Sequence, residues 1–157
     1  MVLTVLETPH VIVGAAIATK VGNPLLAIPL AFTSHFILEK VPHWNPHLNT
    51  ETEKYGKPTK KSTYIVIADS TLALLSGLVI AQQALPNLLS FLTILASSFV
   101  AVLPDLVEAP YFFLNLRSRK IRRWINFQKS LQVDAPFFPG ILSQVAVILA
   151  SLWWLAT

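Results

Sequence analysis

The stretch YIVIADSTLALLSGLVIAQQA, residues 64–84, is followed after a short turn by LLSFLTILASSFVAVL, residues 88–103. A helix needs about 20 apolar residues to cross a bilayer, and the first stretch has that length. The second remains largely apolar beyond residue 103, so we expect one membrane helix over 88–116. Pro86 and Asn87 lie between the two stretches and predict a tight turn. Together they predict an antiparallel pair of membrane helices.

The rest of the chain has the composition of a membrane protein. Only 13% of its 157 residues are charged, against about 25% in a soluble domain. A further apolar stretch, 137–155, ends with two tryptophans, which are typical of a membrane interface. We therefore expect an all-α, polytopic integral membrane bundle that forms a single domain over residues 1–157. Residues 1–10 contain no lysine or arginine, so a cleaved signal peptide is not expected.

Residues 10–40 are apolar but are interrupted by Lys20, Gly22 and Pro24. A single long helix would place a lysine and a helix breaker inside the membrane. Two shorter helices would make the interruption a turn, with Gly22 ending the first helix and Pro24 in the first turn of the second. We prefer this helical hairpin, which either dips into the membrane without crossing it or lets Lys20 reach the interface. Ser62 or Thr63 is the expected N-cap of the next helix.

Two polar segments separate the apolar ones. Residues 42–61 are a hydrophilic loop with four lysines, and Arg117–Lys129 (RSRKIRRWINFQK) predicts a basic helix lying on the membrane surface. Basic segments stay on the cytoplasmic side, which predicts a prokaryotic inner-membrane protein with both segments inside. The arginines either set this topology and attract anionic lipid headgroups, or bind a phosphate of the substrate. Nucleic acid is not expected as a partner, because membrane segments flank the basic helix.

Seven histidines and acids in or beside the apolar segments map to the cytoplasmic end of this topology. Ionisable groups inside a membrane are costly, and their presence indicates function. Asp69 lies among branched apolar residues, and we see no inexpensive structural reason for it there. The full set is His10, His35, Glu39, His43, Asp69, Asp105 and Glu108.

A divalent metal is the natural partner of such a set. Imidazole nitrogens with carboxylate oxygens suit zinc, manganese or iron. His35 and Glu39 are four residues apart and Asp105 and Glu108 three apart, so each pair shares a helix face. Simpler explanations remain open, because the first pair could be hydrogen-bonded and Asp105 could cap a helix. The absence of cysteine excludes disulfides, thiolate zinc sites and cysteine nucleophiles.

The segments TPHVIVGAAIA (8–18), TSHFILEKVPHWN (33–45) and LPDLVEAP (103–110) resemble a bacterial and archaeal group of small inner-membrane, metal-dependent hydrolases, the LexA-regulated type among them. The resemblance implies metal binding at His10, His35, Glu39 and Asp105. The group typically has aspartate where this chain has Glu39, and the chain lacks a His-Arg-Gly-x-x-His stretch found in many members.

We therefore expect a membrane-embedded hydrolase with zinc or manganese that cleaves a phosphoester or similar bond of a lipid or amphipathic substrate at the cytoplasmic interface. Asp69, His43 and Glu108 would complete the metal shell or act as base. The alternative is a non-enzymatic scaffold or partner protein whose polar cluster binds a metal or packs helices. A proton or metal carrier is disfavoured, because the outer half of the helices offers only serine, threonine, glutamine and asparagine.

Overall fold

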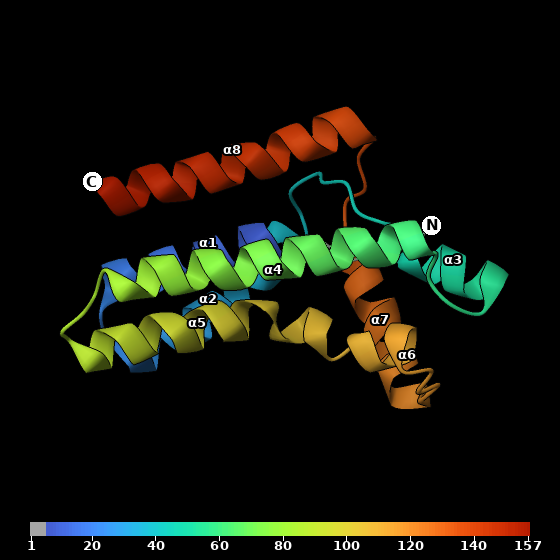
Figure 1. Ribbon diagram of the computed structural model, residues 1–157, viewed down its shortest axis with the longest axis horizontal. Helices are drawn as coiled ribbons and strands as arrows, with labels where there is room; N and C mark the ends of the chain where they lie inside the picture. Colours follow the sequence, from blue (N-terminus) through green and yellow to red (C-terminus); the bar gives the residue numbers. More distant parts are fainter. Residues whose placement is uncertain (1–5) are drawn as a thin grey trace.

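The computed structural model describes residues 6–157, and the regular structure in this range is helical apart from an isolated β-bridge between His43 and Asp134. This confirms the all-α prediction for the described residues. The prediction that the N-terminal segment is not a cleaved signal peptide concerns residues 1–10, of which the first five lie outside the described range. In Figure 1 the long helices run along the longest axis, and the short ones gather at one end. The helices are α1 Glu7–Val21, α2 Pro24–Leu38, α3 Leu48–Tyr55, α4 Lys60–Gln82, α5 Leu88–Leu106, α6 Ala109–Phe113, α7 Arg119–Leu131 and α8 Phe137–Ala156.

Helices α1 and α2 form the hairpin that the sequence predicts. The chain reverses at Gly22, which has φ +69° and whose N–H donates to the carbonyl of Ala18. Asn23 caps α2, because its side chain accepts a hydrogen bond of 2.9 Å from the N–H of Leu25. The hairpin places the start of α1 and the end of α2 at the same end of the molecule.

Helices α4, α5 and α8 are long and apolar enough to cross a membrane, as predicted. Large apolar side chains are exposed on their outward faces, among them Leu74 on α4 and Leu142 on α8. Such surfaces suit contact with lipid. The N-cap of α4 differs from the prediction, since Thr59 rather than Ser62 or Thr63 accepts a backbone hydrogen bond there.

The prediction of one helix over 88–116 is wrong. Helix α5 ends at Leu106, and the separate short helix α6 follows. Pro110 lies in the first turn of α6 and has no N–H to continue the ladder of α5. Asn115 then takes a positive φ of 56°, which turns the chain towards α7. The bend leaves Asp105 in the last turn of α5, at the end where the short helices gather.

The loop predicted over 42–61 contains a helix, α3, and is interrupted before α4 by Gly56 at φ +77°. Sequence reasoning missed it because LNTETEKY is polar and carries little apolar periodicity. The helix is held by its buried Leu48, which packs in a cluster with Tyr111, Phe112 and Ile125. This cluster ties α3, α6 and α7 together beside the ends of α4 and α5.

Helix α7 lies across the end of the bundle, at a steep angle to the long helices (Figure 1). Its apolar side packs on the protein, because Ile125 is buried and the indole N–H of Trp124 donates to the carbonyl of Pro104 at 2.9 Å. Its basic residues Arg119, Lys120 and Arg123 are exposed. The helix is therefore amphipathic, with one face on the protein and one free for a membrane surface.

Small residues let α1 approach α5 closely. A side-chain carbon at Gly14 would lie 2.8 Å from both the Cβ of Ala101 and the carbonyl oxygen of Ser97. Ala15 and Ala101 are fully buried. Close backbone approach over small residues is how helices pack where water provides no driving force. The approach brings the start of α1 against the last turns of α5, which positions the candidate site.

Candidate metal centre

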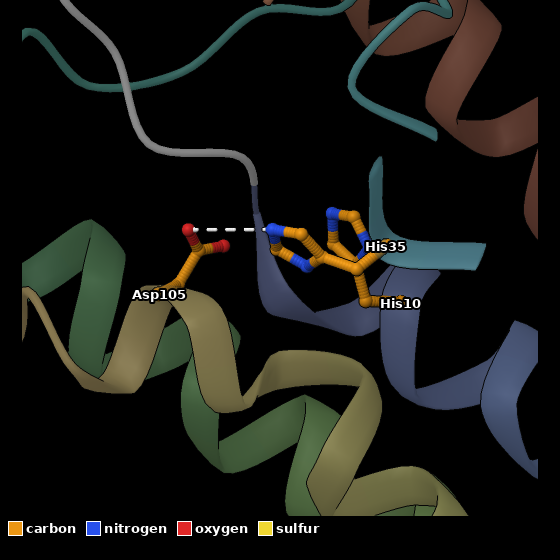
Figure 2. Close-up of side chains that lie close together, drawn as sticks. All are labelled: His10, His35 and Asp105. Atoms are coloured by element: carbon orange, nitrogen blue, oxygen red, sulfur yellow. Dashed lines mark ion pairs between the residues drawn. The ribbon is translucent and has the colours of Figure 1, made fainter. Parts of the chain in front are cut away.

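Three buried side chains from three helices converge at this end of the bundle. His10 comes from the first turns of α1, His35 from the last turn of α2 and Asp105 from the last turn of α5. Each offers one ligand atom, and these atoms lie within 4.8 Å of one another. Figure 2 shows the two imidazoles side by side, with the Asp105 carboxylate directed at them.

His35 is oriented by a backbone contact. Its Nδ1 lies 2.9 Å from the carbonyl oxygen of Ala101, so Nδ1 carries the proton and donates. Its Nε2 lies 2.9 Å from the side-chain oxygen of Gln128, 3.8 Å from Asp105 Oδ1 and 3.9 Å from Glu39 Oε1. A histidine that donates one N–H to a carbonyl and presents the other nitrogen to carboxylates has the arrangement usual for a metal ligand.

His10 is fully buried, and neither of its ring nitrogens has a hydrogen-bond partner among the described residues. Its ring stacks on that of His35, with centroids 4.4 Å apart and an interplanar angle of 28°. Its Nε2 lies 3.7 Å from Glu39 Oε1. Buried polar groups are nearly always bonded, so an unbonded imidazole beside a carboxylate calls for a ligand.

Two further carboxylates are almost fully buried: Glu39 lies beside both histidines, and Glu108 shares the Gln128 amide with Asp105. Burial, and then the charges of Asp105 and Glu108, together raise the pKa of Glu39 to about 9. Burial and then Asp105 raise the pKa of Glu108 to about 8, against the effect of a hydrogen bond from Gln128. The end of the bundle therefore concentrates more acidic groups than it can ionise without a cation.

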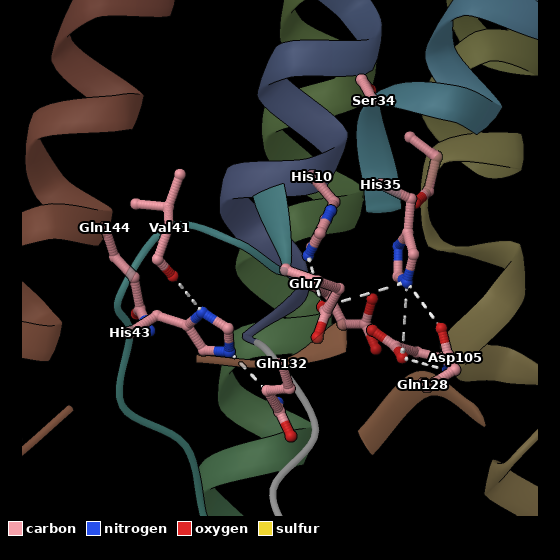
Figure 3. Close-up of polar contacts among 12 residues, drawn as sticks. Glu7, His10, Ser34, His35, Val41, His43, Asp105, Gln128, Gln132 and Gln144 are labelled. Atoms are coloured by element: carbon pink, nitrogen blue, oxygen red, sulfur yellow. Dashed lines mark hydrogen bonds and ion pairs between the residues drawn. The ribbon is translucent and has the colours of Figure 1, made fainter. Parts of the chain in front are cut away.

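Gln128 of α7 closes the cluster and was missed by sequence reasoning. Its amide nitrogen donates to Asp105 Oδ1 at 3.0 Å and to Glu108 Oε1 at 2.7 Å, and its oxygen lies 2.9 Å from His35 Nε2 (Figure 3). A signal existed, because Gln128 follows Ile121, Trp124 and Ile125 at helical spacing and so belongs to the buried face of α7.

Glu7 was also missed as a site residue. It lies three residues before His10 in the first turn of α1, so the two share a helix face. Its Oε2 is buried and unbonded within the described part of the chain. Figure 3 shows its side chain at the cluster, between the histidines and the acids. The Glu-x-x-His spacing was the available signal.

Asp69 does not join the cluster. Its carboxylate accepts hydrogen bonds from the backbone N–H of Glu7 and from the hydroxyl of Thr8, the latter at 2.6 Å. The N-terminal N–H groups of a helix need such acceptors, and the N-cap residue of α1 provides no side-chain bond. The expectation that Asp69 lacks a structural reason is therefore wrong, because it caps α1 from a neighbouring helix.

His43 is buried outside the group of converging ligand atoms. Its Nδ1 lies 2.6 Å from the carbonyl oxygen of Val41, and its Nε2 lies 3.1 Å from the Gln132 amide nitrogen. Burial lowers its pKa. Both contacts lie away from the group of His10, His35 and Asp105, so His43 is not part of that group. His47 precedes α3 as its N-cap residue and makes no side-chain capping hydrogen bond.

The donor set fits a divalent metal. The buried His10–His35–Asp105 group can hold an ion, and the nitrogens and oxygens involved are those that zinc and manganese accept. Zinc ligands lie about 2.0–2.2 Å from the ion, so a small approach of the three side chains would bring all of them into contact with one ion. Glu39 would be a further ligand, because its Oε1 lies within 4 Å of Nε2 of both histidines.

No family model matches the chain, and neither a curated protein nor a solved structure does. The resemblance to membrane-bound hydrolases therefore stays a prediction from short motifs. The function has to be argued from the geometry of the site.

Two arginines of the basic segment have contacts inside the protein. Arg122 donates to the Tyr111 hydroxyl at 2.8 Å, and Arg117 donates to the carbonyl of Tyr111 at 3.0 Å and to that of Gly56. Their guanidinium groups also lie against the Tyr111 ring. These two arginines join α3, α6 and α7, while the remaining basic residues of the segment face outward.

Proposed function

We propose that the protein is a membrane-embedded, metal-dependent hydrolase, with His10, His35, Asp105 and Glu39 binding zinc or manganese. The observation that carries the proposal is the unbonded, fully buried imidazole of His10, stacked on a second imidazole that faces two carboxylates. A core histidine with a purely structural role would have a hydrogen-bond partner.

The chemistry follows from the residues around the centre. A divalent cation held there would lower the pKa of a water molecule and polarise a phosphoryl or carbonyl oxygen. Glu108 is the residue best placed to accept or return a proton, because it shares the Gln128 amide with Asp105 and lies beside the ligands. Gln128 orients both carboxylates at the same time, which fixes the positions of ligand and base.

An apolar pocket beside the acids supports an amphipathic substrate. The pocket has a volume of about 240 Å³ and lies between α1, α4 and α5. Leucine, valine and phenylalanine side chains line most of it, and its polar residues are Glu7, Ser70 and Ser98. Leu74 and Phe99 on its wall are exposed on the outward surface. An acyl chain entering from the bilayer would fit such a pocket and leave its ester or phosphoester group near the cluster.

The same proposal places the centre at the cytoplasmic face of a prokaryotic inner membrane, with membrane lipids as partners. The support is the basic helix α7, which supplies Gln128 to the cluster and presents Arg119, Lys120 and Arg123 outward. Anionic lipid headgroups near Arg117–Lys129 would hold this helix at the surface.

A non-enzymatic scaffold is the second candidate. Gln128 favours it, since this residue bonds two acids and contacts His35 in a closed network that would also serve to pack helices. The scaffold needs neither a metal nor turnover.

The deciding experiment measures metal content and hydrolysis together. Detergent-purified protein is loaded with Zn²⁺ or Mn²⁺, freed of excess metal and analysed by mass spectrometry; cleavage of phospholipids in mixed micelles is then followed. We expect at least about one ion per chain, with metal and cleavage both lost in His35→Ala. His47→Ala is the matched control, because it removes a histidine outside the cluster and should keep both. A wild-type protein that binds no metal, or a His35→Ala variant that keeps it, would contradict the proposal.

A further inference from the structure

A small cavity lies next to the histidine cluster and shares Asp105 with it. The cavity has a volume of about 70 Å³, and its polar lining comes from Glu7, Ser70 and Asp105. Its other walls are apolar, and neither His10 nor His35 is among the described residues that line it. The space exceeds the roughly 10–15 Å³ that a water or ion needs. Asp105 therefore contacts His35 and also lines the cavity that Glu7 borders.

Each of the two acidic residues that line this cavity has one carboxylate oxygen without a hydrogen-bond partner among the described residues. Asp105 Oδ1 accepts from Gln128, but Asp105 Oδ2 is buried and unbonded within residues 6–157. Glu7 Oε2 is likewise buried and unbonded there. Two buried carboxylates beside one cavity are unfavourable unless a cation or protons lie between them. The apolar walls offer nothing else that could compensate them.

We infer that this cavity is a second cation site, with Glu7 as its own ligand and Asp105 as a carboxylate bridging to the ion held by His10 and His35. The inference rests on the proposed function and deepens it. Two cations about 3.5–4 Å apart are the arrangement that stabilises both the attacking and the leaving oxygen in phosphoester cleavage. The site thereby points to phosphoesters rather than carboxylic esters as substrates.

The two positions differ in donor type. The first has two imidazole nitrogens, which suit zinc or manganese. The second has only carboxylate oxygens and Ser70 nearby, and such sparse oxygen sites are typical of Mg²⁺ or Mn²⁺ that keep several waters. Manganese suits both, so it is the probe of choice.

The test counts manganese ions. Detergent-purified wild-type protein, loaded with Mn²⁺ and freed of excess, should hold about two ions per chain and give the electron paramagnetic resonance signal of a carboxylate-bridged pair. Glu7→Gln keeps the shape of the side chain but removes its charge, so we expect about one ion and the signal of an isolated Mn²⁺. Glu53→Gln, an exposed acid on α3, is the matched control and should behave as wild type.

Each result separates the two ideas. A wild-type protein with one ion that still cleaves phospholipid would overturn the second site and leave the proposed function intact. A protein with no bound ion would overturn both. Two ions retained in Glu7→Gln, with the coupled signal unchanged, would place the second ion elsewhere and refute the role of Glu7. The melting temperature of each variant, measured without metal, shows whether the fold is kept.

Discussion

Two aspartates on apolar helices have different surroundings, although each looks equally costly in the sequence. Asp105 faces His35 and the Gln128 amide, and one of its oxygens remains unbonded. Asp69 is occupied by the first turn of α1, through Glu7 N–H and the Thr8 hydroxyl. Asp105 therefore has an oxygen atom free for a metal, while Asp69 completes the hydrogen bonding at the start of α1.

Replacing Asp69 tests this difference. Asp69→Ala removes the acceptor that caps α1, so the free energy of unfolding should fall by about 1–2 kcal/mol. Metal content at saturating metal should remain that of the wild type, because Asp69 is outside the cluster. Thr71→Ala is the control; this exposed hydroxyl bonds only within α4. Thermal denaturation in detergent gives the stability, and loss of metal without loss of stability would instead make Asp69 a ligand.

At the scale of elements, the contact between α1 and α5 decides whether the site can form. Gly14 of α1 lies directly over the backbone of Ser97 and the side chain of Ala101. Ala101 also supplies the carbonyl that orients His35. Small residues at this crossing therefore serve both packing and the geometry of the histidines.

A larger side chain where α1 crosses α5 should lower both the stability of the fold and the affinity for metal. Gly14→Val places carbon atoms against a backbone oxygen that cannot yield, so overpacking should cost about 1–3 kcal/mol of stability. Because α1 moves away from α5, His10 and Asp105 move apart. The affinity for Zn²⁺ should therefore fall, since the two side chains can no longer bind the same ion. Ala146→Val on the exposed face of α8 adds the same bulk without such contact and should change neither property. Titration with zinc alongside thermal denaturation measures the two effects; unchanged affinity in Gly14→Val would show that the crossing does not position the site.

The whole molecule has its buried acids at one end. Glu39 and Glu108 have pKa values of about 9 and about 8 in the folded chain, against an ordinary 4.5. The folded state without metal thus holds protons that the unfolded chain releases above pH 4.5. The free energy of unfolding is then greatest below pH 4.5. It falls as the pH rises from there to the folded-state pKa values of about 8 and about 9.

This predicts a melting temperature that falls between pH 5 and pH 9 for metal-free protein in a chelator. Glu108→Gln should flatten the decrease, because it removes one of the two titrating groups. Added Zn²⁺ should stabilise the protein more at pH 8 than at pH 5, since its ligands bind in their deprotonated form. A melting temperature that rises with pH in chelator would contradict the buried acids as described.

Sequence patterns were enough to predict the helical class, the three helices long enough to cross a membrane and the turn at Gly22. These features depend on local properties, namely apolar length and the conformations open to glycine and proline. The sequence also placed His10, His35 and Asp105 at one depth, because depth follows from the position of a residue along its helix.

Which of these side chains face one another could be seen only after the helices were packed together. That depends on the rotation of each helix about its axis and on the crossing of α1 over α5, neither of which local pattern fixes. The packing made Asp69 a cap, brought Gln128 onto the cluster from α7 and bonded both nitrogens of His43 elsewhere. The position of α3 was also decided by tertiary contacts, because Leu48 packs on Tyr111, Phe112 and Ile125, which are distant in the chain.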